Sequence, residues 1–195
     1  MPVPPTSQPS NTRDALVAML AARSARTGTF TLASGRQSSL YIDARITTMS
    51  PDGLVLIGQL GLAALRQTDW GDVDAVGGLT LGADPIACAI AYASASSSRP
   101  LRAFTVRKEA KTHGTGKLIE GPFSLGDRVA VIEDTITTGG SARRAIEAVR
   151  GAGGFVAGVL ALVDREEGGR EALTELGVPV VSLVRASEIL PLIAR

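Results

Sequence analysis

The feature that most constrains this chain is an apolar run followed at once by two acids and a small-residue turn, at residues 128–141. Three of the four residues at 129–132 are β-branched, which is typical of a strand buried on both faces of a sheet. Glu133 and Asp134 come next, where we expect the strand to leave the core. A turn rich in Thr, Gly and Ser follows, and residues 142–149 are good helix formers.

A strand, a small-residue turn and a helix start together make a site for an anionic group. Glycines let the backbone approach a ligand, and unpaired N–H groups at the helix start point towards it. The two carboxylates would repel a phosphate, so we expect them to meet sugar hydroxyls or a metal ion. The pattern therefore predicts a ribose phosphate site. An ordinary turn with capping Thr and Ser is the alternative, but buried charges need partners.

Composition limits the classes of protein that remain possible. At 195 residues the chain fits one domain, which we expect at 12–195, with a loose Pro/Ser-rich arm at 1–11. The net charge of +1 implies no general attraction to nucleic acid or membranes. Apolar runs are far shorter than the ~20 residues of a membrane helix. Cys88, the single cysteine, excludes an intrachain disulfide and favours a reducing cytoplasm; we expect it to be buried.

The order of predicted elements indicates an α/β fold. A helix at 12–24, broken by Gly28, precedes two short strands at 29–32 and 38–43 and a helix at 51–66 capped by Ser50. After these, strands and helices alternate and the strands are almost continuously apolar. This pattern predicts a sheet covered by helices on both faces. The strands are expected at 73–76, 101–106, 129–132, 155–163 and 178–184, and the helices at 84–95, 142–151, 168–176 and 187–193.

One connection, residues 107–127, is too long for this alternation. Connections of this length inside a domain are usually functional. It carries four cations and the only histidine, and residues 117–120 can return to the sheet as an edge strand. The cations either belong to a solvated surface loop or form a cationic lid over a pyrophosphate leaving group. His113, with an ordinary pKa of ~6.5, can donate a proton or hydrogen bond to a departing oxygen.

Two further segments stand at the ends of predicted strands. The loop at 77–85 is rich in small residues and either presents N–H groups to a pyrophosphate or simply packs tightly at a helix entry. Arg165 follows the strand at 155–163, near where a ligand would lie in an open α/β sheet. Its alternative role is in an ordinary charged loop.

Several motifs together resemble those of the orotate phosphoribosyltransferases, members of the type I phosphoribosyltransferases. They are the acid pair with its Thr-Thr-Gly-Gly-Ser turn, Thr-Leu-Ala-Ser-Gly-Arg-Gln-Ser at 31–38, Arg-Lys-Glu-Ala-Lys-Thr-His-Gly at 107–114 and Asp-Arg-Glu-Glu at 164–167. The resemblance covers about residues 12–190. It implies a mostly parallel sheet with strand order 3-2-1-4-5-6 and one antiparallel edge strand. It also implies a small N-terminal hood at 12–50, a core at 51–195 and a mobile lid at 107–121.

The resemblance also implies a reaction and a set of site residues. Orotate and 5-phosphoribosyl 1-diphosphate (PRPP) would give orotidine 5′-monophosphate and pyrophosphate, with Mg²⁺ carried by PRPP and not directly by protein side chains. Glu133 and Asp134 would hold the ribose hydroxyls. The pyrophosphate would meet the lid, and Lys111 would be the lid residue most tied to catalysis. The remaining implied contacts are Arg107, Lys108, Lys111 and His113 for pyrophosphate, Thr135, Thr137, Thr138, Gly139, Gly140 and Ser141 for the 5′-phosphate region, and Thr137, Arg165, Ser34 and Arg36 for orotate.

Three positions depart from the family pattern. Ala33 stands where many members have a lysine, Leu40-Tyr41-Ile42 stands where paired aromatics often cover the base, and Glu133 replaces a commoner Asp. The resemblance further implies a homodimer in which the lid reaches the neighbouring site. Two alternatives stay open: a phosphoribosyltransferase for another nucleobase, and a non-catalytic PRPP-sensing regulator, which would need a DNA-binding segment or basic face.

Overall fold

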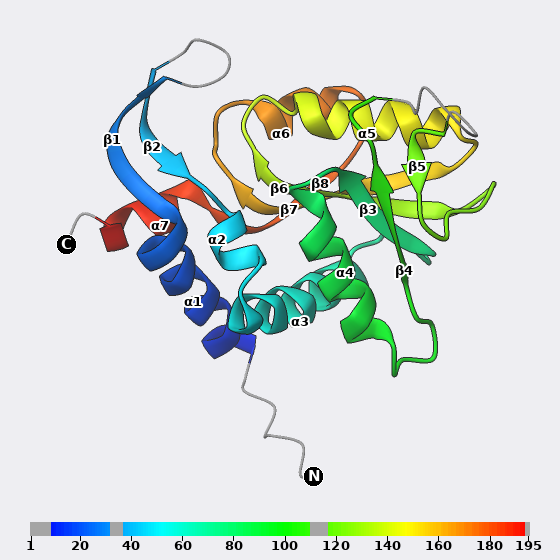
Figure 1. Cartoon of the computed structure of the whole chain (residues 1–195), viewed down its shortest axis with the longest axis horizontal. Helices are drawn as coiled ribbons and strands as arrows, with labels where there is room; N and C mark the ends of the chain where they lie inside the picture. The colour runs from blue at the N-terminus through cyan, green and yellow to red at the C-terminus, as the bar shows by residue number, and fades with distance from the viewer. Residues whose placement is uncertain (1–8, 32–36, 110–116, 194–195) are drawn as a thin grey trace.

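The computed structural model describes residues 9–31, 37–109 and 117–193. Its centre is a six-stranded sheet with the strand order β5-β4-β3-β6-β7-β8 (Figure 1). All neighbouring strands are parallel except β5, which pairs antiparallel with β4 at the edge. The predicted strand order and antiparallel edge are therefore confirmed. The strands are β3 (Ala75–Leu79), β4 (Arg102–Val106), β5 (Ile119–Glu120), β6 (Arg128–Ile136), β7 (Phe155–Asp164) and β8 (Val180–Arg185).

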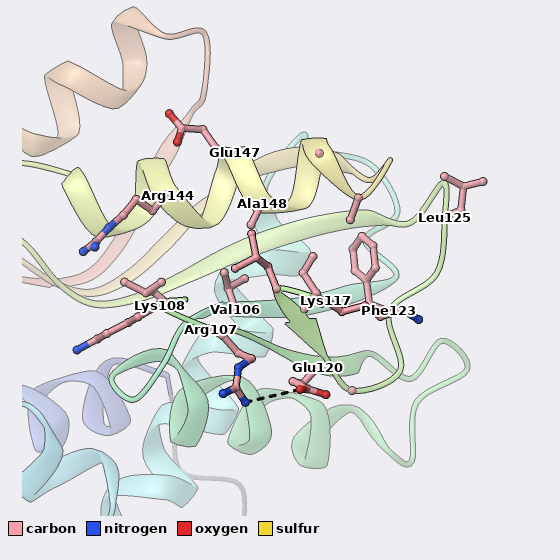
Figure 2. A pocket seen from close by; sticks show the side chains of 16 residues that line it. Val106, Arg107, Lys108, Lys117, Glu120, Phe123, Leu125, Arg144, Glu147 and Ala148 are labelled. Atoms are coloured by element: carbon pink, nitrogen blue, oxygen red, sulfur yellow. Dashed lines mark ion pairs between the residues drawn. The ribbon is translucent and has the colours of Figure 1, made fainter. Parts of the chain in front are cut away.

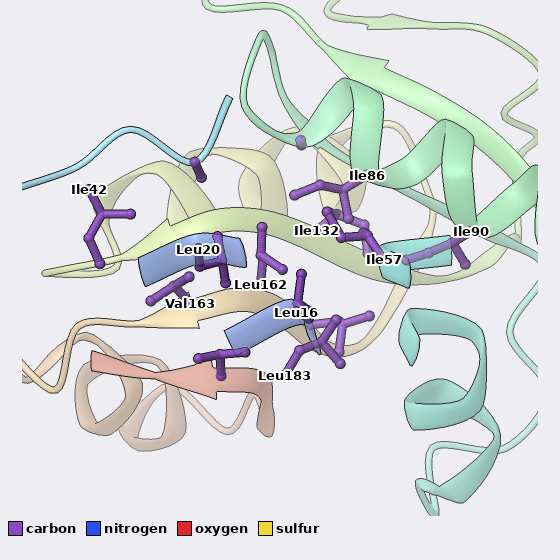
Figure 3. Packing of buried hydrophobic residues seen from close by; sticks show 14 of the residues in the cluster. Leu16, Leu20, Ile42, Ile57, Ile86, Ile90, Ile132, Leu162, Val163 and Leu183 are labelled. Atoms are coloured by element: carbon purple, nitrogen blue, oxygen red, sulfur yellow. The ribbon is translucent and has the colours of Figure 1, made fainter. Parts of the chain in front are cut away.

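Helices cover both faces of the sheet, as predicted. On one face lie α5 (Gly140–Gly151) and α6 (Gly169–Glu175); on the other lie α1 (Pro9–Met19), α3 (Pro51–Gln67), α4 (Ala83–Ser94) and α7 (Ala186–Ile193) (Figure 1). Each face has its own hydrophobic core. Strand β6 serves both cores, because Val129 and Val131 pack with the α5 cluster whereas Ala130 and Ile132 pack with the α3 and α4 cluster (Figure 3).

The N-terminal segment carries a second, two-stranded sheet and shares the core on the α3 and α4 face. After α1 come a π-helical turn (Leu20–Ser24), β1 (Ala25–Thr31), β2 (Gln37–Ile42) and the short helix α2 (Arg45–Thr48). β1 and β2 pair antiparallel in a two-stranded sheet. The prediction that Gly28 breaks the first helix is wrong. The helical path already ends at Ser24, because Ala25 pairs with Ile42 and the strand runs on through Gly28.

Two strands extend further than expected. β6 does not end at Ile132: Glu133 pairs with Ala161 and Ile136 with Asp164, so the acid pair lies inside the strand. β3 likewise continues through the glycines, because residues 75–79 pair with β4 along their whole length. Backbone pairing with a neighbouring strand sets the ends of β3 and β6. The pattern of side chains in the sequence carries no information about that pairing, so it predicted shorter strands.

Local signals at two helices had different outcomes. Ser50 caps α3 as predicted, since its hydroxyl accepts a hydrogen bond of 3.2 Å from the Gly53 N–H. The predicted burial of Cys88 is wrong: it is exposed because α4 turns Ile86, Ala87 and Ile90 towards the core and Cys88 away from it. Among the helices that the structure describes, none is long and apolar enough to cross a membrane.

Candidate active site

The acid pair occupies the carboxyl-terminal part of β6. Because consecutive strand residues point to opposite faces, Glu133 follows Val131 towards the α5 side and Asp134 follows Ile132 towards the α4 side. Glu133 is 9% exposed, and Asp134 is half-buried and accepts a 2.8 Å hydrogen bond from the Thr135 N–H. The two side chains therefore leave the strand from opposite faces, close to its end.

The loop between β3 and α4 packs directly against Asp134. A Cβ at Gly82 would lie 2.4 Å from an oxygen of the Asp134 carboxyl group, so only glycine fits there without displacing that group. Asp84 fixes the loop, because its carboxylate accepts hydrogen bonds from the hydroxyls of Thr80 at 2.7 Å and Thr105 at 2.9 Å. The glycine loop predicted from the sequence thus forms one wall beside the acid pair.

On the other side, the Thr-Gly turn leads into α5. Gly139 has a φ of +79°, a left-handed conformation that favours glycine. Among the described residues no side chain caps the first turn of α5, so its N–H groups are available to an anion. The turn lines a cavity of about 270 Å³, which we name the loop cavity. Its lining residues are Glu133, Thr135, Ile136, Thr137, Thr138, Gly139, Gly140, Ser141 and Arg144.

A larger cavity of about 530 Å³, which we name the acid cavity, connects these parts. Both carboxyl groups of the acid pair line it, together with Thr80–Gly82 from the β3–α4 loop and residues 41–45 at the end of β2 and just after it. Lys108 and Arg165 add cationic side chains to its wall. A sugar phosphate placed here would meet carboxylates, hydroxyls and helix N–H groups at once.

Burial and the neighbouring Asp134 change the titration of Glu133. Burial, the Asp134 charge and a hydrogen bond between the two carboxyl groups raise the pKa of Glu133 to about 8, while Arg144 acts in the opposite direction. Burial also raises the pKa of Asp134. At neutral pH and without ligand, the pair therefore retains a proton that hydroxyl donors or a cation would displace.

This proton makes a testable prediction about stability. The folded state holds it up to about pH 8 whereas the unfolded chain loses it near 4.5, so the ligand-free protein loses stability as pH rises across that window. Glu133→Gln removes this loss. The unfolding free energy of the variant minus that of the wild type should therefore increase by on the order of 2 kcal/mol from about pH 5 to about pH 8. Urea unfolding of both proteins at the two pH values measures the difference. Parallel pH profiles would contradict a buried, protonated Glu133.

No protein-family model matches the chain. An orotate phosphoribosyltransferase of Aquifex aeolicus is 49% identical over 161 residues, which is 83% of this chain and 86% of that protein. One of Rhodopseudomonas palustris is 45% identical over 185 residues, 93% and 97% of the two chains. This chain belongs to the orotate phosphoribosyltransferase family.

Solved structures of this family agree with the fold. Orotate phosphoribosyltransferase of Mycobacterium tuberculosis superposes with a TM-score of 0.79 at 42% identity, covering 91% of this chain and 98% of that one. A structure of the same enzyme in complex with PRPP has a TM-score of 0.75 at 39% identity, with the same coverage. An adenine phosphoribosyltransferase of Leishmania donovani, 16% identical with a TM-score of 0.63, shows the fold alone. The fold is that of the type I phosphoribosyltransferases.

The structure brings together most of the described residues that resemblance to the orotate phosphoribosyltransferases had suggested. The acid pair, the residues of the Thr-Gly turn, Lys108 and Arg165 line the loop cavity or the acid cavity. Arg107 lines neither; it faces a separate groove, with its guanidinium 3.7 Å from the Glu120 carboxylate (Figure 2). Ser34, Arg36, Lys111 and His113 lie outside the described residues, as does Ala33, so their roles stay predictions.

Arg165 has a structural role in addition to its predicted role in binding orotate. Its side chain is 4% exposed, and Nη2 donates to Ser38 Oγ at 2.9 Å, to the Leu40 carbonyl at 2.8 Å and to Glu167 at 2.7 Å. These bonds hold β2 against the end of β7. Its Nε is buried and, within the described part of the chain, has no hydrogen-bond partner. Arg165 therefore fixes the wall of the acid cavity that it lines.

Sequence reasoning missed three contributors to the site. Asp43 and Arg45 line the acid cavity as a pair 2.9 Å apart, although their sequence neighbourhood carries no ligand motif. Arg144 lines both cavities from within α5, and its neighbour Arg143 looks identical to it in the sequence. Helical spacing was the one available signal, because Arg144 stands three residues, about one turn, after Ser141.

Proposed function

We propose that this chain transfers the phosphoribosyl group of PRPP to orotate, giving orotidine 5′-monophosphate and pyrophosphate for the synthesis of UMP. The observation that carries the proposal is one cavity lined by the acid pair, the Thr-Gly turn, Lys108 and Arg165. The bond between the anomeric carbon and the diphosphate oxygen breaks, and a ring nitrogen of orotate bonds to that carbon. The diphosphate leaves with the bonding electron pair, and orotate loses the proton on its nitrogen.

Electrostatics explains how these residues would favour the reaction. The anomeric centre becomes oxocarbenium-like as the diphosphate leaves, and the carboxylates of Glu133 and Asp134 stabilise its positive charge. The same carboxylates accept hydrogen bonds from the ribose hydroxyls and so orient the sugar. Thr137, Thr138, Ser141 and the N–H groups of α5 hold the 5′-phosphate.

Cations act on the leaving group. Lys108 lines the acid cavity, and Lys111 and His113 complete the proposed lid contacts with the diphosphate. Arg107 lines neither cavity and would reach the diphosphate only if its side chain left Glu120. Mg²⁺ carried on PRPP supplies further neutralisation of the diphosphate charge when it is bound. The residues present fit that arrangement, because the acid pair offers carboxylates beside the sugar.

Orotate is proposed to lie against Arg165 and Thr137, with Ser34 and Arg36 contributing from the hood. A planar guanidinium suits a carboxylate or paired ring oxygens. Tyr41 lines the same cavity and packs on Phe30 with ring centroids 5.3 Å apart. A homodimer with the lid shared between subunits, a cytoplasmic location and division into arm, hood, core and lid remain parts of the proposal.

Acceptor choice tests the function. Purified protein with Mg²⁺ and PRPP should release pyrophosphate with orotate and show little release with uracil or hypoxanthine. Turnover with either of those bases instead would favour another nucleobase phosphoribosyltransferase. A PRPP-sensing regulator would bind PRPP with Mg²⁺ without releasing pyrophosphate; binding to duplex DNA at low salt would add to that case.

The lid makes a separate prediction. Lys111→Ala should lower turnover roughly 100-fold, because one cation that stabilises the leaving group is lost. Thermal unfolding should be unchanged, since the substitution removes no proposed core contact. Steady-state rates with orotate and PRPP measure the effect, and Lys117→Ala in the same connection is the control. Wild-type turnover in the Lys111 variant would remove the lid from the mechanism.

A further inference from the structure

Arg144 lies where three hollows of the surface meet. It lines the loop cavity, the acid cavity and a groove of about 960 Å³ between α5 and the β4–β5 edge of the sheet. Figure 2 shows its side chain leaving α5 at the end of this groove, on the side towards which Lys108 also points. The guanidinium is thus brought to the border of the proposed PRPP site by a helix and not by a loop.

The position of Arg144 matters because of the charges that line the loop cavity. Among the described residues that line it, Arg144 is the only cation; the others are Glu133 and the neutral residues of the turn. A phosphate ester held there carries up to two negative charges, and N–H groups and hydroxyls supply only partial positive charge. The Glu133 carboxyl group in the same wall would oppose the phosphate whenever it is ionised. A full positive charge is needed to offset both.

The Arg144 side chain is also available. Within residues 9–31, 37–109 and 117–193, no hydrogen bond or ion pair holds it, in contrast to Arg165 and Arg170. The residue is exposed, and its aliphatic stem leaves α5 beside the turn. An unpaired guanidinium offers two parallel N–H donors to two oxygens of one phosphate.

We infer that Arg144 binds the 5′-phosphate of PRPP and of orotidine 5′-monophosphate. The inference rests on the proposed function and adds to it a residue outside the motif. Arg144 contributes a charge-assisted contact to ground state and transition state alike, so its loss should raise KM for PRPP more than it lowers kcat. Arg144 would then neutralise the 5′-phosphate charge close to where Glu133 accepts hydrogen bonds from the ribose hydroxyls.

Arg143 provides a matched control. It is the preceding residue of the same helix, is also exposed and carries the same charge, yet it lines none of the cavities described above. Neutralising either arginine changes the net charge by the same amount. Any difference between Arg144→Gln and Arg143→Gln therefore reports position and not general attraction of anions.

Titration calorimetry with three probes tests the inference. Ribose 5-phosphate and orotidine 5′-monophosphate carry the 5′-phosphate, and pyrophosphate with Mg²⁺ represents the leaving group. Arg144→Gln should raise the Kd of both phosphate esters roughly 10- to 100-fold, the loss expected for a charged hydrogen bond. Its Kd for pyrophosphate should stay within about twofold, Arg143→Gln should match wild type for all three, and Arg144→Lys should recover part of the loss.

Three results would overturn the inference: unchanged ester affinity in Arg144→Gln, an equal loss in Arg143→Gln, or a loss confined to pyrophosphate. If the wild-type protein binds the esters and turns over orotate, and the Arg144→Gln variant behaves identically, only the role of Arg144 is refuted and the proposed function stands. Wild-type protein that binds neither ester and releases no pyrophosphate contradicts the proposed function itself.

Discussion

Asp134→Asn is expected to lower turnover roughly 1000-fold, the upper range for loss of one preorganised electrostatic contact. Asp134→Asn removes one of the two carboxylates that face the anomeric carbon. The one that remains is Glu133, whose pKa burial raises to about 8, so the variant keeps little negative charge there. Asparagine keeps the shape and can still accept the 2.8 Å hydrogen bond from the Thr135 N–H. The variant should therefore fold normally and lose charge alone.

Steady-state kinetics with orotate and PRPP, together with thermal unfolding, measure this prediction. Glu147→Gln is the matched control, because Glu147 is an exposed acid of α5 that lines the groove but neither the acid cavity nor the loop cavity. It should retain wild-type turnover within about twofold. A variant at Asp134 with near-normal kcat, or one that loses activity only because it unfolds, would refute a charge-stabilising role.

Gly78→Ala is expected to destabilise the protein by more than about 3 kcal/mol. A Cβ there would lie 2.0 Å from the Ile132 carbonyl oxygen and 2.8 Å from the Cβ of Ala83. The first contact is with backbone of the adjacent strand β6, so no side-chain rotation relieves it. Strands β3 and β6 would have to separate at the place where the two ligand loops leave the sheet.

Urea unfolding monitored by circular dichroism measures this loss of stability. Gly151→Ala is the control. At the end of α5 a new Cβ would meet no atom of the described residues within 4 Å, and the change in unfolding free energy should stay within about 1 kcal/mol. Equal stability of the Gly78 variant and wild type would mean that β3 and β6 lie further apart than described.

Local patterns in the sequence predicted the elements but not their ends. Apolar segments identified the parallel strands of the central sheet, and Ser50 with Pro51 marked the start of α3 correctly. The edge strand β5 was expected only as a return of residues 117–120 to the sheet. The acid pair was expected after β6 and lies within it, because pairing with β7 extends the strand to Ile136. Such backbone pairing joins residues distant in sequence, and the strand order itself came from family resemblance.

The site divides in the same way. The acid pair and Thr-Gly turn are contiguous in sequence, so their chemistry could be predicted from residue types and order. The contacts of Arg165 with Ser38 and Leu40 span more than a hundred residues and follow only from the fold. Arg144 could not be separated from Arg143 until the helix direction was known. Roles assigned to Ser34, Arg36, Lys111 and His113 stay predictions.

A crystal structure of the protein soaked with PRPP and Mg²⁺ tests the central claim most directly. The account predicts the ribose hydroxyls on Glu133 and Asp134 and the 5′-phosphate in the loop cavity at Thr137–Ser141. PRPP bound elsewhere would contradict this claim. So would finding both the loop cavity and the acid cavity without PRPP at a concentration that saturates turnover.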